Sequence, residues 1–147
     1  MTNTLNLEVI TPYGIIYSDN SVSSVNIPGV TGILGILPHH TPLFCQLTQG
    51  EVKITKGNEE IYLAIGGGFI EVANNKVTVL VTRAVHASEL NEKEILEAQR
   101  RAEQLLKEKP TGEALLEAQS LYRSSLIDLR VFRRKMRSRS LPQTPQS

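Results

Sequence analysis

The sequence has little cysteine, few aromatic residues and no marked excess of either charge. Of its 147 residues one is Cys, none is Trp and 5% are aromatic. The lone Cys45 excludes a disulfide within the chain and a Cys-cluster metal site, and it is compatible with a reducing compartment. No apolar run approaches the roughly 20 residues that a membrane-spanning helix needs, and no signal-peptide pattern opens the sequence. We therefore expect the chain by itself to be soluble.

The composition is otherwise that of a globular protein with an uneven distribution of charge. Hydrophobic residues make up 40% and charged residues 21% of the chain, which disfavours a collagenous or wholly disordered protein. The formal net charge is +1, yet residues 120–147 contain seven basic residues and one acidic residue. Residues 1–85 contain four basic and six acidic residues, and residues 86–119 five and eight. Positive charge is thus concentrated at the C-terminal end.

Residues 1–87 have the pattern of a β-sandwich. Apolar residues alternate with polar ones over residues 5–9, 51–55, 61–65 and 77–81, which predicts strands with one buried face. Residues 56–58 and 74–75 carry Gly and Asn between such runs and predict antiparallel hairpins. Many short strands without intervening helices favour a sandwich or flattened barrel over a parallel α/β sheet.

Residues 88–137 predict an antiparallel pair of amphipathic helices. The first has its start signal at Asn91 with Glu94, or at Ser88, and the second runs from about Glu113 to about Arg137. The apolar stripe of each helix contains small residues, so we expect a hairpin held more weakly than one with large side chains. Residues 138–147, rich in Ser, Pro, Gln and Arg, predict a disordered tail.

No convincing catalytic, metal or cofactor site is visible in the sequence. The triple glycine at 66–68 lacks the Lys and helix of a phosphate loop and indicates a bend or bulge in the sheet. His39 and His40 are adjacent, without an evident third ligand, and Cys45 lies in an apolar stretch typical of a buried thiol. We expect no catalytic residue, no metal and no cofactor.

The C-terminal helix predicts a ridge of arginines on its outer face. At 100° per residue, Arg123, Arg130, Arg134 and Arg137 share one side, with Arg133 beside them. One explanation is that this face is simply exposed to solvent. The other is that it binds a negatively charged partner, which could be an acidic protein surface, a nucleic acid or an anionic membrane. Leu116, Ile127 and Val131 lie off the apolar stripe and are candidates for further protein contacts.

Several motifs in one order resemble the epsilon subunit of the F-type ATP synthase, called delta in mitochondria. The resemblance covers about Leu5 to Met136. Its segments are GVTGILGILPHHTPL at 29–43, GEVKI at 50–54, GGFIEV at 67–72, NKVTVL at 75–80, EAQRRAE at 97–103 and LRV at 129–131.

The resemblance implies a ten-stranded antiparallel β-sandwich followed by a two-helix domain, in a non-catalytic rotor subunit of the central stalk. It implies that Val30, Thr31 and Gly32 face the c-ring and that His40 lies near the gamma subunit. The family often carries acidic residues where this chain has Thr31 and Ile33, a departure that concerns charge pairing with the c-ring. The expected location is the cytoplasmic face of the bacterial plasma membrane, with membrane contact only through the complex.

The resemblance also implies that the hairpin can extend toward the catalytic beta and alpha subunits and restrain ATP hydrolysis. Arg123, Arg130, Arg133 and Arg134 match the inhibitory contact. Some relatives bind ATP through Ile/Leu-Asp-x-x-Arg-Ala, but residues 90–95 here read LNEKEI. A glutamate in place of the arginine opposes a triphosphate, so we predict weak or absent ATP binding, which isothermal titration measures.

Two other functions compete with this interpretation. A nucleic-acid-binding module that uses the basic helix predicts RNA binding with a steep salt dependence, although we expect no nucleic-acid partner. A small hydrolase is disfavoured because no nucleophile and base are evident. Recovery of gamma from the same cell separates the three.

Overall fold

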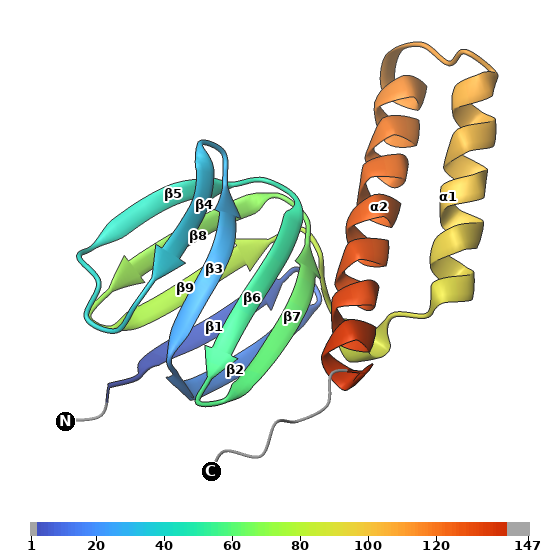
Figure 1. The fold of residues 1–147 in the computed structure, drawn as a ribbon. Coiled ribbons are helices and arrows are strands. Elements are labelled where there is room, and N and C mark those ends of the chain that lie inside the picture. Colours follow the sequence, from blue (N-terminus) through green and yellow to red (C-terminus); the bar gives the residue numbers. More distant parts are fainter. Residues whose placement is uncertain (1–2, 141–147) are drawn as a thin grey trace. The chain divides into compact units, whose positions relative to one another are not determined.

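The computed structural model describes residues 3–140, with side chains up to residue 137 (Figure 1). The chain divides into two compact units between His86 and Ala87. The first unit contains β1 (Leu5–Thr11), β2 (Gly14–Val22), β3 (Ser24–Gly29), β4 (Gly32–Ile36), β5 (Leu43–Leu47), β6 (Gly50–Lys56), β7 (Glu59–Ile65), β8 (Gly68–Ala73), β9 (Lys76–Val81) and β10 (Ala84–His86). The second contains the 3-10 turn η1 (Ala87–Glu89), α1 (Glu92–Lys107) and α2 (Gly112–Ser140).

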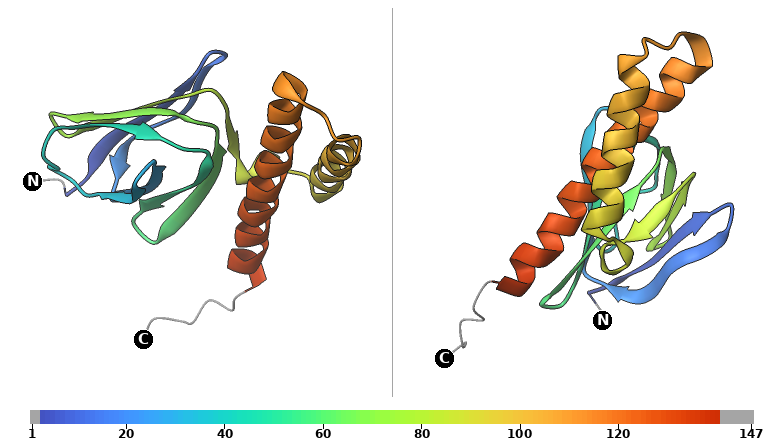
Figure 2. Two further views of the ribbon diagram at one scale, coloured as in Figure 1. Left: turned by 90° about the horizontal axis from the view of Figure 1, so that it is seen from above. Right: turned by 90° about the vertical axis from the view of Figure 1, so that its right-hand side faces the viewer.

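The ten strands form one continuous sheet that folds over into two layers (Figures 1 and 2). The order is β10-β7-β6-β3-β5-β8-β9-β1-β2, with β4 added beside β3. The layers join where Gly29 of β3 pairs with Leu47 of β5. The sandwich predicted from the alternating pattern is confirmed, with one difference: β1 pairs with β9 in parallel. β1 lies between β9 and its hairpin partner β2.

The core lies between the two layers and consists of the apolar residues in the inward phase of each strand. Leu5, Leu7 and Val9 of β1 are each at most 1% exposed. The alternation of β6, β7 and β9 fills the rest of the core in the same way: Val52, Ile54, Leu63, Ile65, Val77, Val79 and Val81 belong to one buried cluster. Burial of this apolar surface is the main source of the stability of the sandwich.

The turns and bends are made by the residues expected for them. Asn74 and Asn75, between β8 and β9, both have positive φ (51° and 60°), as a two-residue hairpin turn requires. The triple glycine lies between β7 and β8 and is followed by a strand rather than a helix, as predicted for a bend in the sheet. A Cβ added to Gly68 would collide with the carbonyl oxygen of Leu80, so the two strands approach closely at this point.

The helices form the predicted antiparallel hairpin, with α1 and α2 side by side in both views of Figure 2. Asn91 is the N-cap of α1: its side-chain oxygen accepts hydrogen bonds from the backbone N–H groups of Lys93 and Glu94 at 2.9 and 3.4 Å. The hairpin buries small side chains, since Ala102, Ala118 and Ser125 are at most 2% exposed.

The two helices differ greatly in length. At 1.5 Å per residue, the 16 residues of α1 span about 24 Å and the 29 residues of α2 about 43 Å, so the C-terminal part of α2 extends past the start of α1. Met136, which the periodicity placed on the apolar stripe, is accordingly 46% exposed. The helix was expected to end at about Arg137 and continues for three more residues, to Ser140. The rest of the expected tail, residues 141–147, lies outside the described residues.

Candidate functional surfaces

The residues expected to face the c-ring form the tip of the β3–β4 hairpin. Gly29 pairs with Gly32, which leaves Val30 and Thr31 as a two-residue turn. Gly32 has a φ of 141°, which favours glycine, and the Val30 N–H donates to the carbonyl oxygen of Gln46 at 3.1 Å. Val30 is 52% exposed. The tip is therefore a short projection that is held by a backbone hydrogen bond to β5 and carries an apolar side chain at its end.

His40, expected near gamma, lies at the opposite end of the sandwich. It follows β4 in the loop that leads to β5, and its Nδ1 is 2.7 Å from the carbonyl oxygen of Thr41. The preceding His39 has a φ of 61°, and its N–H donates to the side-chain oxygen of Asn75 at 2.8 Å. The structure thus ties this loop to the β8–β9 turn, and it does not bring His40 together with the hairpin tip.

A row of outward-facing apolar side chains crosses the layer β2-β1-β9-β8-β5. The register places Ile15 opposite Ile10, Ile10 opposite Leu80, and Leu80 opposite Phe69. Ile15 is 60%, Leu80 50% and Phe69 45% exposed. Phe44 of β5, 70% exposed, stacks on Phe69 with ring centroids 5.6 Å apart. We call Ile10, Ile15, Phe44, Phe69 and Leu80 the outer apolar row.

A groove of about 420 Å³ lies beside this row. Its walls come from the end of β1, the bend before β8 and the end of β9, and they include Ile10, Pro12, Phe69 and Leu80. A contiguous apolar surface with a groove is typical of a protein-binding site. The outer apolar row can therefore receive an apolar side chain of a partner.

Sequence reasoning missed this row, although the sequence contains a signal for it. In an alternating strand the outward positions are normally polar. Here Leu80 lies between the inward Val79 and Val81, and Phe69 precedes the inward Ile70. Apolar residues in the outward phase of neighbouring strands would have indicated a covered outer face, but which strands are neighbours is known only from the register.

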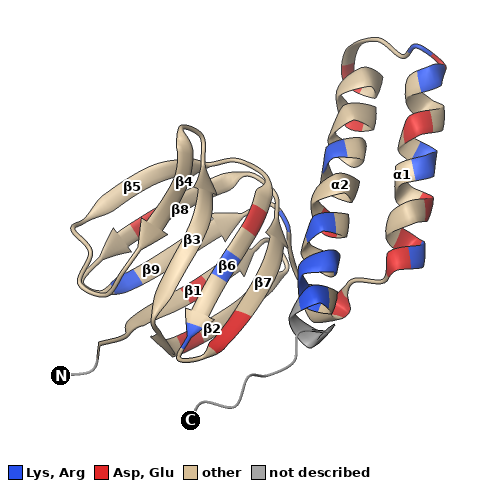
Figure 3. Cartoon of the chain, viewed as in Figure 1, with Lys and Arg blue, Asp and Glu red and all other residues tan. Residues whose placement is uncertain are grey.

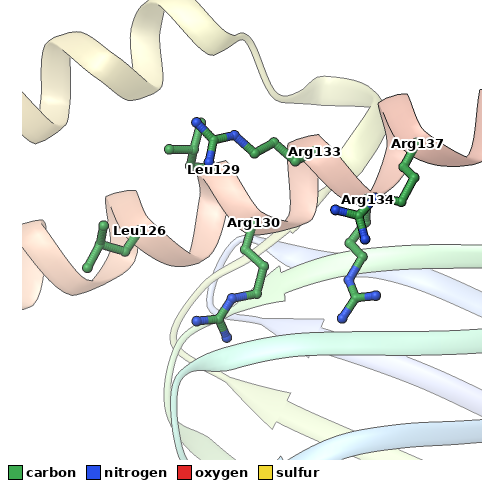
Figure 4. Close-up of a pocket in the computed structure, with 6 residues that line it drawn as sticks. All are labelled: Leu126, Leu129, Arg130, Arg133, Arg134 and Arg137. Atoms are coloured by element: carbon green, nitrogen blue, oxygen red, sulfur yellow. The ribbon is translucent and has the colours of Figure 1, made fainter. Parts of the chain in front are cut away.

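The predicted arginine ridge lies on α2 and is exposed. Arg123, Arg130, Arg133, Arg134 and Arg137 are all solvent-accessible, and four of them line a depression of about 420 Å³ with Leu126 and Leu129 (Figure 4). Arg130 and Arg134 extend from one side of the helix, whereas Arg133 lies with Leu129 on another (Figure 4). The residues from Leu129 to Arg137 fall in the part of α2 that extends past α1. Of the other candidates for partner contacts, Leu116 is 65% exposed and Ile127 is half-buried, whereas Val131 is buried and does not offer a free surface.

An ion pair links β2 to β6 on the sandwich. Lys56 Nζ is 2.7 Å from Asp19 Oδ2, and the Ser21 N–H donates to Asp19 Oδ1 at 2.8 Å. The hydrogen bond from Lys56 lowers the pKa of Asp19 below its ordinary value. Burial, with Asp19 close by, raises the pKa of Tyr17 to about 12. At neutral pH Asp19 is therefore charged and Tyr17 neutral, so the ion pair with Lys56 and the hydrogen bond that the Tyr17 hydroxyl donates to Asp19 are both kept.

The described residues contain no group of three or more His, Cys, Asp or Glu side chains placed to hold a metal ion. Cys45 is half-buried against the core, in the inward phase of β5. Within residues 3–140, neither α-helix is long and apolar enough to cross a membrane.

The comparisons with known proteins agree on one family. The family model described as ATP synthase, Delta/Epsilon chain, beta-sandwich domain matches residues 4–87. The ATP synthase epsilon chain of Herpetosiphon aurantiacus is 35% identical over 127 residues, which cover 86% of this chain and 93% of that relative. The epsilon chain of Lawsonia intracellularis is 47% identical over 91 residues, 62% of this chain and 68% of the relative.

Solved structures show the same fold at low sequence identity. A chain in the Euglena gracilis mitochondrial ATP synthase, solved as OSCP/F1/c-ring, aligns with a TM-score of 0.64 and 19% identity, covering 94% of this chain and 82% of its own length. A chain in the central stalk/c-ring structure from Tetrahymena thermophila aligns with a TM-score of 0.58 and 18% identity, covering 89% and 98%. A matching family model over more than half of the chain, together with relatives that align along nearly its whole length, shows that this chain belongs to the epsilon chain family of ATP synthase.

Proposed function

We propose that this chain is a non-catalytic rotor subunit of the central stalk, which joins the gamma subunit to the c-ring through its sandwich and restrains ATP hydrolysis through its helical hairpin. It acts within the ATP synthase on the cytoplasmic face of the bacterial plasma membrane. Gamma, the c-ring and, when the hairpin extends, the catalytic beta and alpha subunits are its partners.

The observation that carries the coupling role is that the sandwich has two exposed apolar surfaces, one on the face of a layer and one at an end of the sandwich. The outer apolar row lies on the face of one layer, and the tip around Val30 projects from the end of the sandwich. A protein that couples two partners needs two such surfaces. We assign the outer apolar row, with the loop at His40, to gamma and the tip at Val30, Thr31 and Gly32 to the c-ring.

The restraint of hydrolysis is supported by the charge and packing of the hairpin. Arg123, Arg130, Arg133 and Arg134 are exposed and offer a positive surface to an acidic partner. Figure 3 shows basic positions along α2. The buried residues of the helical hairpin include the small Ala102, Ala118 and Ser125, which bury less apolar area than leucines would. A docked and an extended state that differ by only a few kcal/mol are compatible with such a contact.

Removal of residues 88–147 tests the two roles separately in the assembled enzyme. We expect the shortened chain to assemble with gamma while ATP hydrolysis rises, because the restraining helices are gone. In the full chain, Arg130→Gln with Arg133→Gln is expected to raise hydrolysis as well. Arg100→Gln with Arg101→Gln, two exposed cations on α1, is the matched control and is expected to change nothing. Unchanged hydrolysis in the shortened chain would refute the restraint; failure to bind gamma would refute the coupling role.

A further inference from the structure

The layer that carries the outer apolar row contains few charged residues, and all but one of them are paired. The charged side chains of strands β2, β1, β9, β8 and β5 are Glu8, Asp19, Glu71 and Lys76. Asp19 is paired with Lys56, and Glu8 Oε2 is 3.7 Å from Lys76 Nζ. Among the described residues, none places a cation within ion-pair distance of Glu71.

Glu71 lies directly beside the aromatic stack. The register places it opposite Phe44 of β5, and it follows Phe69 by two residues on the same face of β8. Neighbouring strands lie about 4.8 Å apart, and residues two positions apart on a strand are separated by about 6.6 Å. The exposed carboxylate is therefore at the border of the outer apolar row, within reach of a partner that covers Phe44 and Phe69.

The groove at the other border of the row is uncharged. The described residues that line it are apolar residues, glycines and two threonines. One of these glycines is Gly68, three residues before Glu71 on β8, which corresponds to about 10 Å along the strand. The surface thus has an apolar groove at one border and a single carboxylate at the other.

A partner that covers the aromatic stack also removes water from Glu71. Loss of hydration by an unpaired carboxylate is unfavourable, whereas a cation placed opposite it offsets that cost. Apolar contacts alone discriminate weakly between partners, and a charge at their border favours the partner with the matching charge. The surface therefore fits a partner that carries an apolar side chain and a lysine or arginine about 10 Å apart.

We propose that Glu71 is a specificity-determining residue for gamma binding, which pairs with a lysine or arginine of gamma at the border of the outer apolar row. This rests on the proposed function, since it takes gamma as the partner that covers the row, and it adds the chemistry that gamma must present. Glu8 and Asp19 already have cations within the chain and do not take this role. The consequence is that gamma binding has a component that added salt screens.

The test measures the affinity of the full chain for purified gamma by calorimetry at about 50 and about 500 mM KCl, where ion pairs are screened weakly and strongly. Glu71→Gln removes the charge and keeps the size and polarity of the side chain. We expect this variant to bind gamma roughly three- to tenfold more weakly than the wild type at the lower salt concentration. At the higher concentration we expect the two affinities to lie within about twofold of each other.

A control and a charge reversal locate the contact. Glu59→Gln, an exposed carboxylate on β7 in the other layer, is the matched control and is expected to bind gamma as the wild type does at both salt concentrations. Glu71→Lys is expected to weaken binding more than Glu71→Gln. Replacement of one lysine or arginine of gamma by glutamate is expected to restore binding of Glu71→Lys, and that position identifies the partner cation. Both positions in this chain are exposed, so folding should be retained, which thermal unfolding checks.

Several results would overturn the proposal while leaving gamma as the partner. These are wild-type affinity of Glu71→Gln at low salt, a loss of affinity that is equal at both salt concentrations, and no charge reversal in gamma that restores binding of Glu71→Lys. Self-association of Glu71→Gln together with unchanged gamma affinity, detected by light scattering, would also overturn it, because the carboxylate would then keep the free chain monomeric. A wild-type chain that does not bind gamma would instead refute the proposed function itself.

Discussion

Replacement of Phe69 by Ala is predicted to weaken binding to gamma by about one to one and a half orders of magnitude. Phe69 is 45% exposed and lies at the centre of the outer apolar row. A phenylalanine exposes roughly 200 Å² when fully accessible, so about 90 Å² is available for a partner to cover. At about 25 cal/mol per Å² this burial contributes about 2 kcal/mol, or roughly a thirtyfold change in Kd.

The stack between Phe44 and Phe69 makes this prediction more specific. Their rings are 5.6 Å apart and inclined by 17°, so each holds the other in place on the surface. Removal of Phe69 leaves Phe44 without its neighbour, and the double variant is expected to cost less than the sum of the two single variants. A double-mutant cycle on gamma affinity, measured by calorimetry with the full-length chain, gives the coupling directly.

Ile33→Ala is the matched control for gamma binding. Ile33 is also apolar and is 79% exposed, but it lies on β4, away from the outer apolar row. We expect Ile33→Ala to bind gamma with wild-type affinity and to keep the wild-type thermal unfolding midpoint. Phe69→Ala loses its stack on Phe44, so its affinity is compared at a temperature at which both variants are folded. A Phe69→Ala variant that binds gamma within twofold of wild type would refute the assignment of this face. An Ile33→Ala variant that weakens gamma binding as much as Phe69→Ala does would also refute the assignment.

Three further predictions concern stability. Gly68→Ala should destabilise the sandwich by more than about 2 kcal/mol in denaturant unfolding, because its Cβ would meet the backbone of Leu80. Asn91→Ala should cost about 1 kcal/mol and reduce the helical signal of α1 in circular dichroism, since two N–H groups lose their acceptor. The pKa of Asp19 is lowered by the hydrogen bond from Lys56. Its contribution to stability is therefore present above the ordinary aspartate pKa near 4 and is lost as pH falls below it, so the gap in unfolding midpoint between wild type and Asp19→Asn should close in acid.

Local patterns predicted strands over residues 5–9, 51–55, 61–65 and 77–81, two turns and the helical hairpin, because each depends on neighbouring residues. Period-two alternation identifies Leu5, Leu7 and Val9 as inward whatever strand lies beside them. The Asn74-Asn75 turn and the Asn91 cap are likewise short-range chemistry.

Local patterns could not predict which distant strands pair with one another. Nothing near β1 indicates that it lies parallel to β9, some seventy residues later in the chain. The outer apolar row depends on that pairing, because Ile10 meets Leu80 only through it. The end of the sandwich at the β3–β4 turn has the same origin, because only the sheet order brings together loops that are far apart in sequence.

The placement of β1 between β2 and β9 has a consequence for synthesis on the ribosome. β1 and β2 can form a hairpin as soon as they emerge, yet the other edge of β1 has no partner until residues 76–81 are made. During that interval an apolar strand with unsatisfied backbone groups is open to pairing with another nascent chain. Closure of the sheet then depends on contacts of long sequence separation, which makes it slow compared with formation of the helical hairpin. A chaperone that shields the first twenty-two residues would therefore be expected to raise the yield of folded protein more than one that shields the helices.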